Sequence, residues 1–145
     1  MRLALGSDHA GYDHKAQLAE YLRASGHDVV DVGPDNGDDS VDYPDYARLA
    51  CEAVASEQVD RAILVCGTGI GMAIAANKIS NIRAANVTTP AFGVLCREHN
   101  DANVLTLSGR FIDYDTNKAI ADAFLATEYG GDRHQRRLDK IAELE

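Results

Sequence analysis

The chain alternates between short apolar runs that suit β-strands and longer segments whose apolar residues recur at helical spacing. The clearest strand is the continuous run AILV at 62–65, which a glycine-rich loop and a helical segment follow. Apolar runs without alternation are typical of strands buried on both faces of a parallel sheet. Because strands that alternate with helices form βαβ units, the pattern predicts an α/β fold.

Five strand–helix steps occupy the chain, which at 145 residues has the length of one domain, 1–145. We expect strands at 2–5, 28–32, 62–65, 83–87 and 103–107. The predicted architecture is a doubly wound, Rossmann-like, five-stranded parallel sheet of order 2-1-3-4-5 with helices on both faces. The last stretch, 132–145, is predicted to be an amphipathic helix at a subunit interface.

Two loops stand out in this arrangement because ligands bind beyond the carboxyl ends of parallel strands, near the point where strand order reverses. The loop GSDHAG at 6–11 follows the first strand, and CGTGIG at 66–71 follows the third. The order predicts that these two strands are neighbours. We therefore expect the two loops to face each other.

Cys66 opens the second loop, between a strand and a helix N-terminus. The unpaired N–H groups of a helix start favour a thiolate, so Cys66 is predicted to act as a base or nucleophile. The alternative is that it is a small core residue, as cysteine often is. Cys51 and Cys96 lie within helical segments, and we predict that they serve packing.

The glycines of the same loop let the backbone approach a ligand and turn N–H groups toward an anion, while Thr68 adds a hydroxyl. A dinucleotide fingerprint is weakly supported, because Met72 stands where its third glycine would be. A Walker loop is also not matched, because Tyr12 and Asp13 follow Gly11 instead of Lys and Ser or Thr.

Further candidates are Asp8 and His9, after the first strand, and His99 and Asn100, at the end of a helix. Asp8 and His9 suit sugar hydroxyl or phosphate contacts, although Asp8 can equally cap the next helix. His99 is open to two interpretations, a site residue or a helix C-terminal cap. No histidine pair has zinc-ligand spacing with a third ligand, so no metal is expected.

A net charge of −9 argues against a nucleic-acid partner, which requires a basic surface. Against this background, Arg133 and Arg137 lie four residues apart on one helical face that Ile141 continues. Guanidiniums that lead into an apolar stripe are placed to hold a phosphate at a subunit boundary, and Arg110 is predicted to lie at the carboxyl edge and join them.

No membrane partner is expected, because no apolar run approaches the ~18 residues that a span requires. The first residues lack the apolar core of a secretory signal. The three cysteines include no C-x-x-C pair. These features predict a protein of the reducing cytoplasm.

Five motifs, SDHAG, CGTGIG…AANK, REHNDANVL, GR and RHQRR, together resemble the B-type ribose-5-phosphate isomerases and the related galactose-6-phosphate isomerases, in order and spacing over the whole chain. The resemblance implies a cofactor-free aldose–ketose isomerase that moves a proton between C1 and C2 of a sugar phosphate through an enediolate. It also implies homodimers, often paired into homotetramers, whose sites are built from both subunits.

By the same resemblance, Cys66 is the base, and Thr68 and the amides of Gly67 to Gly71 stabilise the enediolate. His99 acts as the acid that opens the furanose ring. The remaining assignments are substrate contacts by Asp8, His9, Gly67, Gly69, Ile70, Gly71, Asn100, Arg110, Arg133 and Arg137. Some relatives use a glutamate in the stretch equivalent to 72–75, but here that stretch holds no carboxylate.

One segment departs from the family pattern. Residues 86–95 read NVTTPAFGVL, with Ala91 where many relatives place an aromatic side chain directly after the proline. Ribose 5-phosphate is the expected substrate, and allose 6-phosphate, galactose 6-phosphate or a tetrose phosphate are alternatives. A non-catalytic flavodoxin-like binding module is a further alternative, as is a subunit that acts only in mixed oligomers.

Overall fold

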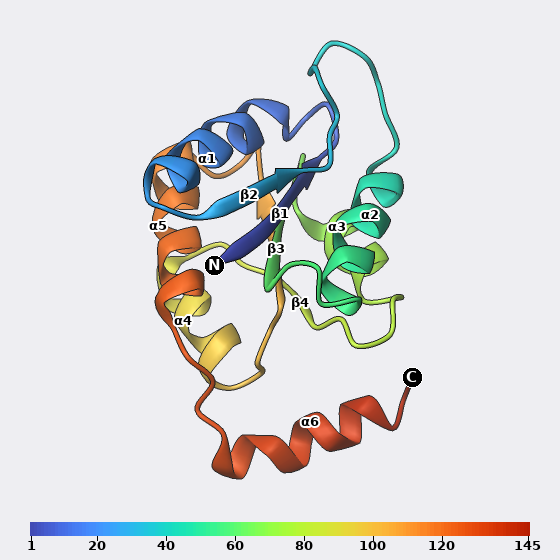
Figure 1. Ribbon diagram of the computed structural model, residues 1–145, viewed down its shortest axis with the longest axis vertical. Coiled ribbons are helices and arrows are strands. Elements are labelled where there is room, and N and C mark those ends of the chain that lie inside the picture. The colour runs from blue at the N-terminus through green and yellow to red at the C-terminus, as the bar shows by residue number, and fades with distance from the viewer.

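Five parallel strands form one sheet in the computed structural model, which describes residues 1–145 (Figure 1). The order is β2-β1-β3-β5-β4. The central strands pair apolar residues, with Leu5 opposite Ile63 and Ile63 opposite Leu105. The strands are β1 (Arg2–Ser7), β2 (Asp28–Asp31), β3 (Arg61–Cys66), β4 (Ala84–Asn86) and β5 (Val104–Ser108).

The predicted order 2-1-3-4-5 is wrong at one edge, where the last two strands exchange places. All five residues of β5 are buried, whereas β4 has three residues and none of them is fully buried. A strand inside a sheet is covered on both sides, and an edge strand is short and partly exposed. The longer apolar strand therefore takes the inner position. The α/β class, the parallel sheet and the β1–β3 neighbourhood are confirmed.

Two layers of helices cover the sheet, as predicted (Figure 1). One buried cluster joins Leu18, Leu105 and Phe124, and it lies beneath α1, α4 and α5. A second cluster joins Ala50, Leu64 and Met72 beneath α2 and α3. The helices are α1 (Tyr12–Ala24), α2 (Tyr43–Ala55), α3 (Ile70–Ala76), α4 (Pro90–Glu98) and α5 (Tyr114–Ala126).

Local sequence explains where two of these helices begin. The Thr89 hydroxyl accepts the Phe92 N–H before α4, and Pro90 occupies the first turn, where its missing N–H costs nothing. The Asp113 carboxylate accepts the Thr116 N–H at 2.9 Å before α5, and this bond lowers the pKa of Asp113. Both helices therefore start at side-chain caps that are visible in the sequence.

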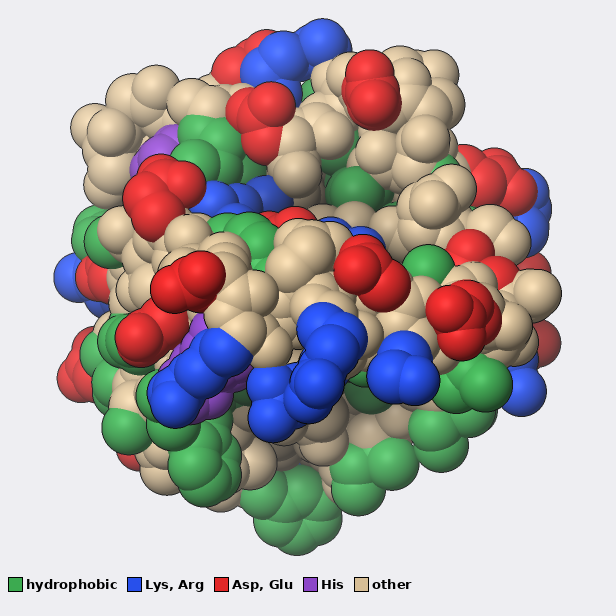
Figure 2. All heavy atoms as spheres, turned by 90° about the horizontal axis from the view of Figure 1, so that it is seen from below, with side chains coloured by type: hydrophobic (Ala, Val, Ile, Leu, Met, Phe, Trp, Pro, Cys, Tyr) green, Lys and Arg blue, Asp and Glu red, His purple; other side chains and the backbone are tan.

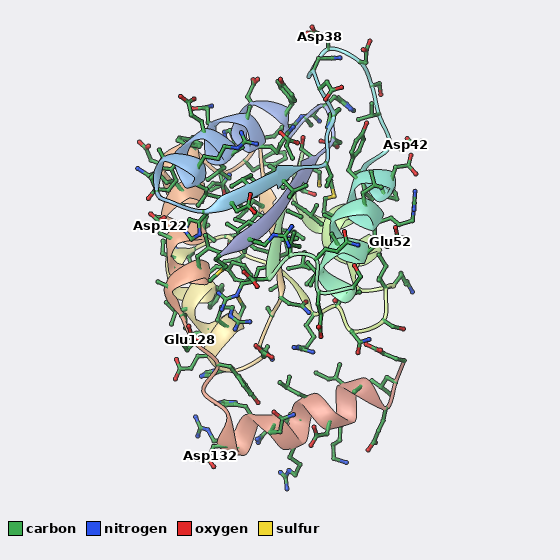
Figure 3. All side chains as sticks on the ribbon, viewed as in Figure 1. Asp38, Asp42, Glu52, Asp122, Glu128 and Asp132 are labelled. Carbon is green, nitrogen blue, oxygen red and sulfur yellow. The ribbon has the colours of Figure 1, made fainter.

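A long loop at 32–42 connects β2 to α2 and stands above the carboxyl edge of the sheet, with Asp38 near its tip and Asp42 near α2 (Figure 3). Lys15 anchors the start of this loop from α1. Its Nζ lies 2.8 Å from both carboxylate oxygens of Asp31 and 2.9 Å from the Pro34 carbonyl oxygen. The loop is therefore fixed to the sheet by a buried cation.

The C-terminal segment is helical, as predicted, but shorter than 132–145. A 3₁₀ turn, η1 (Asp132–His134), leads into α6 (Gln135–Ala142). This helix lies across the amino end of the sheet, opposite the loop that carries Asp38 (Figures 1 and 3). Only Leu138 of α6 is buried, and Ile141 stays 46% exposed. None of the helices has the length and apolar character needed to cross a membrane.

Candidate active site

Cys66 ends β3 at the carboxyl edge of the sheet, and its side chain is nearly buried. Its sulfur lies 3.1 Å from the Gly69 nitrogen, so that the Gly69 N–H is aimed at Sγ. The loop thus folds back over its own first residue, and a backbone donor is in place for a thiolate.

The other two thiols are in different surroundings. Burial, followed by the charge of Glu52, raises the pKa of Cys51 to about 12. Burial also raises the pKa of Cys96, whose Sγ donates to the Gly93 carbonyl at 3.3 Å. Cys51 packs from α2 in the same buried cluster as Cys66, and Cys96 packs in the other buried cluster, which agrees with the predicted packing role of both thiols.

Two glycines of the loop have close neighbours. Gly69 has φ +80°, and a Cβ there would lie 3.0 Å from the Leu107 carbonyl oxygen and closer still to Asn86 Oδ1. A Cβ on Gly71 would lie 2.7 Å from the Tyr43 ring. Gly69 is therefore required by its backbone conformation and by the backbone that it meets, whereas a side chain at Gly71 would require the Tyr43 ring to shift.

Several N–H groups of the loop have no acceptor within the chain. The amides of Gly67, Thr68, Gly71 and Met72 donate to no backbone or side-chain oxygen. Thr68 Oγ1 accepts the Ile70 N–H at 3.2 Å. These amides are free at the start of α3, and free amides at a helix start are the kind of donors that bind an anion.

The turn after β5 lies against this loop and brings Arg110 to it. The Gly109 N–H donates to the Cys66 carbonyl at 2.8 Å, and the Arg110 N–H donates to the Gly67 carbonyl at 3.2 Å. A Cβ on Gly67 would lie 3.6 Å from Arg110 Nη1. The Arg110 guanidinium therefore borders the loop, at the edge where it was predicted.

The loop after β1 faces the same space. The Asp8 N–H donates to the Val65 carbonyl at 3.2 Å, and Asp8 Oδ1 accepts the Gly11 N–H at 3.0 Å. His9 Nδ1 accepts the Val41 N–H at 3.3 Å, which assigns the ring proton of neutral His9 to Nε2. The predicted meeting of the two loops is confirmed, since a Cβ on Gly67 would lie 3.9 Å from the Cβ of Ala10.

The remaining candidates lie elsewhere. His99 is the C-cap of α4, and its ring stacks on that of His134 with centroids 4.4 Å apart and an interplanar angle of 16°. Partial desolvation, then the neighbouring His99 and the cations Arg133 and Arg137, lower the pKa of His134. His99 thus occupies the predicted helix C-terminal position, and its ring contacts the basic C-terminal segment through His134.

Lys and Arg side chains gather in a row on the α6 side of the molecule, where a His side chain borders them and hydrophobic side chains lie beside them (Figure 2). The segment from η1 through α6 contributes Arg133, Arg136, Arg137 and Lys140. Arg137 Nη1 donates to the Arg133 carbonyl at 2.6 Å. The predicted arginine face therefore exists on the surface of the chain.

A cavity of about 630 Å³ lies next to this basic segment, between the end of α6 and residues 77–85. Asn100 lines it together with the apolar side chains Ile79, Ile82, Ile141 and Leu144. This cavity places Asn100 beside the C-terminal helix.

Within one chain, the candidate residues form two groups at opposite edges of the sheet. The carboxyl-edge group holds Asp8, His9, Cys66, Gly67, Thr68, Gly69, Ile70, Gly71 and Arg110. The amino-edge group holds His99, Asn100, Arg133 and Arg137. The six residues of β3 alone span roughly 16 Å between these edges. The expectation that Arg110 joins Arg133 and Arg137 at one edge is therefore wrong for a single chain, because α5 follows β5 back across the sheet and delivers the C-terminal segment to the amino edge.

Two residues that border the loop were not predicted. The Tyr43 ring packs against Gly71, and the Asn86 side chain lies over Gly69. Each begins or ends an element, and neither belongs to a motif whose spacing indicates a site. Their position at the end of a strand and at the start of a helix is the one feature by which the sequence could have indicated that they border the loop. No group of three or more His, Cys, Asp or Glu side chains is arranged to hold a metal ion.

Comparison with known proteins agrees with this geometry. The model of the Ribose/Galactose Isomerase family matches residues 3–141. Ribose-5-phosphate isomerase B of Escherichia coli (strain K12) is 41% identical over 144 residues, which are 99% of this chain and 96% of the relative. The structure of Clostridium thermocellum Ribose-5-Phosphate Isomerase B is 44% identical, with a TM-score of 0.97 over 99% of this chain and 97% of that chain.

A third relative carries a ligand. Ribose-5-phosphate Isomerase B from Mycoplasma genitalium was solved with bound Ribulose-5-phosphate, and it is 42% identical, with a TM-score of 0.94 over 99% of this chain and 95% of that chain. The fold, the loop after β3 and the similarity along the whole chain lead to one assignment. The chain belongs to the Ribose/Galactose Isomerase family.

Proposed function

We propose that the chain interconverts ribose 5-phosphate and ribulose 5-phosphate without a cofactor. The observation that carries the proposal is the Cys66 loop, in which a thiol and free backbone amides share one turn at the carboxyl edge of the sheet. A base beside preorganised donors suits proton abstraction next to a carbonyl. The ribulose-5-phosphate bound by the Mycoplasma genitalium relative supports the choice of substrate.

In the proposed reaction, the Cys66 thiolate removes the proton from C2 of the open-chain aldose and returns it to C1. The hydroxyl proton of O2 moves to O1 in the intermediate enediolate, so that the aldehyde becomes a hydroxyl and C2 becomes the ketone. Carbon and oxygen are conserved, and no external oxidant or reductant is needed. The amides of Gly67, Thr68 and Gly71 stabilise the negative oxygen of the enediolate.

We propose that the working enzyme is a homodimer or a homotetramer, because one chain separates the two groups of candidate residues. Cys66, Asp8 and Arg110 of one subunit then face His99 of the partner subunit and Arg137 of the partner subunit. His9 and the arginines hold the phosphate, Asp8 and Asn100 hold sugar oxygens, and His99 protonates the ring oxygen as the furanose opens. Binding energy from the remote phosphate orients C1 and C2 at Cys66.

Sugars of four to six carbons remain alternative substrates. Pro90 and Ala91 begin α4, which follows β4 and therefore starts at the carboxyl edge of the sheet, the edge at which Cys66 ends β3. A small side chain there leaves room beside the sugar. Assays across tetrose, pentose and hexose aldose phosphates distinguish the alternatives, and we expect the highest kcat/KM for ribose 5-phosphate.

The decisive test of the chemistry is Cys66→Ala. We expect a loss of kcat of at least about 10³-fold with an unchanged fold, because the variant lacks the base. The matched control is Cys96→Ala, which removes another nearly buried thiol that lies away from the glycine loop and retains activity. Near-normal turnover of the Cys66 variant contradicts the proposal.

We propose the reducing cytoplasm as the compartment. All three cysteines are free thiols in the structure. Cells that express a tagged form of the protein are fractionated to test this, and the protein is expected in the cytoplasmic fraction. Recovery of the protein outside that fraction contradicts the proposal.

A further inference from the structure

Ser108, the last residue of β5, touches the Cys66 loop from behind. It is 4% exposed. Its Oγ donates to the Gly67 carbonyl at 2.8 Å and accepts the Phe111 N–H at 3.0 Å. The same Gly67 carbonyl accepts the Arg110 N–H, so two donors from one turn converge on it.

The orientation of two peptide groups follows from these bonds. The Cys66 and Gly67 carbonyls both point toward the turn at 108–111, where Gly109, Arg110 and Ser108 donate to them. In a planar trans peptide, the N–H points opposite to the C=O. The amides of Gly67 and Thr68 therefore point away from β5, and neither has an acceptor in the chain.

Hydrogen bonds to a carbonyl also polarise its peptide group, which strengthens the N–H on the other side as a donor. The Gly67 carbonyl and the Thr68 N–H belong to one such group. Ser108 therefore acts on the Thr68 amide both by holding its direction and by polarising it.

Ser108 is itself held by a buried side chain. Asn117 is fully buried in α5, and its Nδ2 lies 2.8 Å from the Ser108 carbonyl oxygen and 2.9 Å from His14 Nδ1. The end of β5 is thus fixed from the helix layer, and the Ser108 hydroxyl has a defined direction.

We propose that Ser108 is a positioning residue for the oxyanion hole: its hydroxyl fixes the Gly67–Thr68 peptide so that the Thr68 N–H stabilises the enediolate. This inference rests on the proposed isomerase function. The hydroxyl does not touch the substrate, and it acts on the donor that does.

The kinetic test compares Ser108→Ala, Ser108→Thr and the wild type. We expect Ser108→Ala to lower kcat about 10-fold with KM within about 2-fold, since an interaction made only in the transition state is weakened. Ser108→Thr keeps the hydroxyl and restores most of kcat. The matched control is Thr127→Val, which removes a part-buried hydroxyl that donates to the Ala123 carbonyl at 2.8 Å, far from the loop.

Three kinetic outcomes overturn the proposal. The first is an unchanged kcat of Ser108→Ala. The second is a raised KM with unchanged kcat, which places the effect on the neighbouring Arg110. The third is a loss of kcat that Thr127→Val reproduces together with an equal drop in Tm, because a general loss of stability then explains both.

An amide NMR spectrum supplies a readout that does not depend on turnover. We expect the Thr68 N–H resonance to move toward weaker hydrogen bonding in Ser108→Ala and to return in Ser108→Thr, while Thr127→Val leaves it in place. An unmoved Thr68 resonance overturns the positioning role. A moved resonance in a protein that isomerises no aldose phosphate supports the positioning role and contradicts the proposed function, so the two failures are distinct.

Discussion

At the scale of single residues, Lys15 is the most unusual choice in the chain. A lysine is rarely buried unless it is paired, and Lys15 is 1% exposed. Its ammonium group binds both carboxylate oxygens of Asp31 and the Pro34 carbonyl, and lies 5.0 Å from the centroid of the Tyr12 ring. One side chain thereby ties α1 to the end of β2 and to the loop that bonds His9.

Replacing Lys15 with Met is expected to lower the free energy of unfolding by about 2–3 kcal/mol, because Asp31 and the Pro34 carbonyl lose their buried partner while Asp31 stays partly solvated. Urea unfolding measures the change. Arg48→Met is the control, since it breaks an exposed pair with Glu52 and is expected to cost less than about 0.5 kcal/mol. Equal losses in both variants contradict this account of Lys15.

At the scale of elements, α6 is attached to the body of the chain more loosely than the other helices. Leu138 is its one buried residue, and the His99–His134 stack and the Glu145 carboxylate, which accepts the Asn81 N–H, add further contacts. Ile141 of α6 and Leu144, which follows the helix, are exposed and line the same cavity as Asn100. Docking of α6 therefore depends on a few groups, one of which is the His134 ring, whose pKa is lowered from its ordinary value.

The docking of α6 is expected to weaken as the pH falls below 6.5, the ordinary pKa of histidine. The pKa of His134 is lowered by partial desolvation and by the adjacent His99 and arginines, so the docked helix favours the neutral ring. A lowered histidine pKa stabilises the docked state above the ordinary value and loses that effect as the pH falls toward the lowered value.

Hydrogen exchange of the α6 amides across pH 5–8 measures this effect, and the His134 ring resonance reports its own titration. In His99→Asn, we expect the His134 pKa to rise toward its ordinary value because one positive neighbour and the stack are lost. A His134 titration that is the same in both proteins contradicts the assigned cause.

At the scale of the whole molecule, the candidate site residues are divided between two edges of the sheet. The thiol, the free amides and Arg110 lie at the carboxyl edge, while His99, Asn100 and the C-terminal arginines lie at the amino edge. Figure 1 shows α6 at this amino edge. Rotation of side chains cannot bring together two groups that lie the length of a strand apart. A second subunit would bring them together if its amino edge lay against the carboxyl edge of the first subunit.

This arrangement predicts complementation between inactive variants. Cys66→Ala and His99→Asn are each expected to be nearly inactive, whereas their mixture after subunit exchange regains about a quarter of wild-type activity, since half of the random dimers carry one intact site of two. Native mass spectrometry confirms that exchange has occurred. An inactive mixture with demonstrated exchange contradicts a site shared between subunits.

Local sequence patterns by themselves determine several secondary-structure elements of this protein and the position of the candidate site. The apolar run of β3 and the glycine loop predicted a strand, a turn and a site at one place, and Gly69 is there because Leu107 and Asn86 leave no space for a Cβ. The caps at Thr89 and Asp113 fixed helix starts. Five motifs in order predicted the family, and the family match over 3–141 confirmed it.

Only the tertiary structure decided which strands are neighbours and which residues meet. The sequence predicts strands of equal length at 83–87 and 103–107, and only the structure shows that the second forms the longer, fully buried strand and takes the inner position. The direction of α4 carried His99 away from Cys66, and the turn after β5 brought Ser108 to the Gly67 carbonyl across 41 residues of sequence. Sequence spacing encodes contacts along one element, whereas contacts between elements depend on how the sheet is ordered and covered.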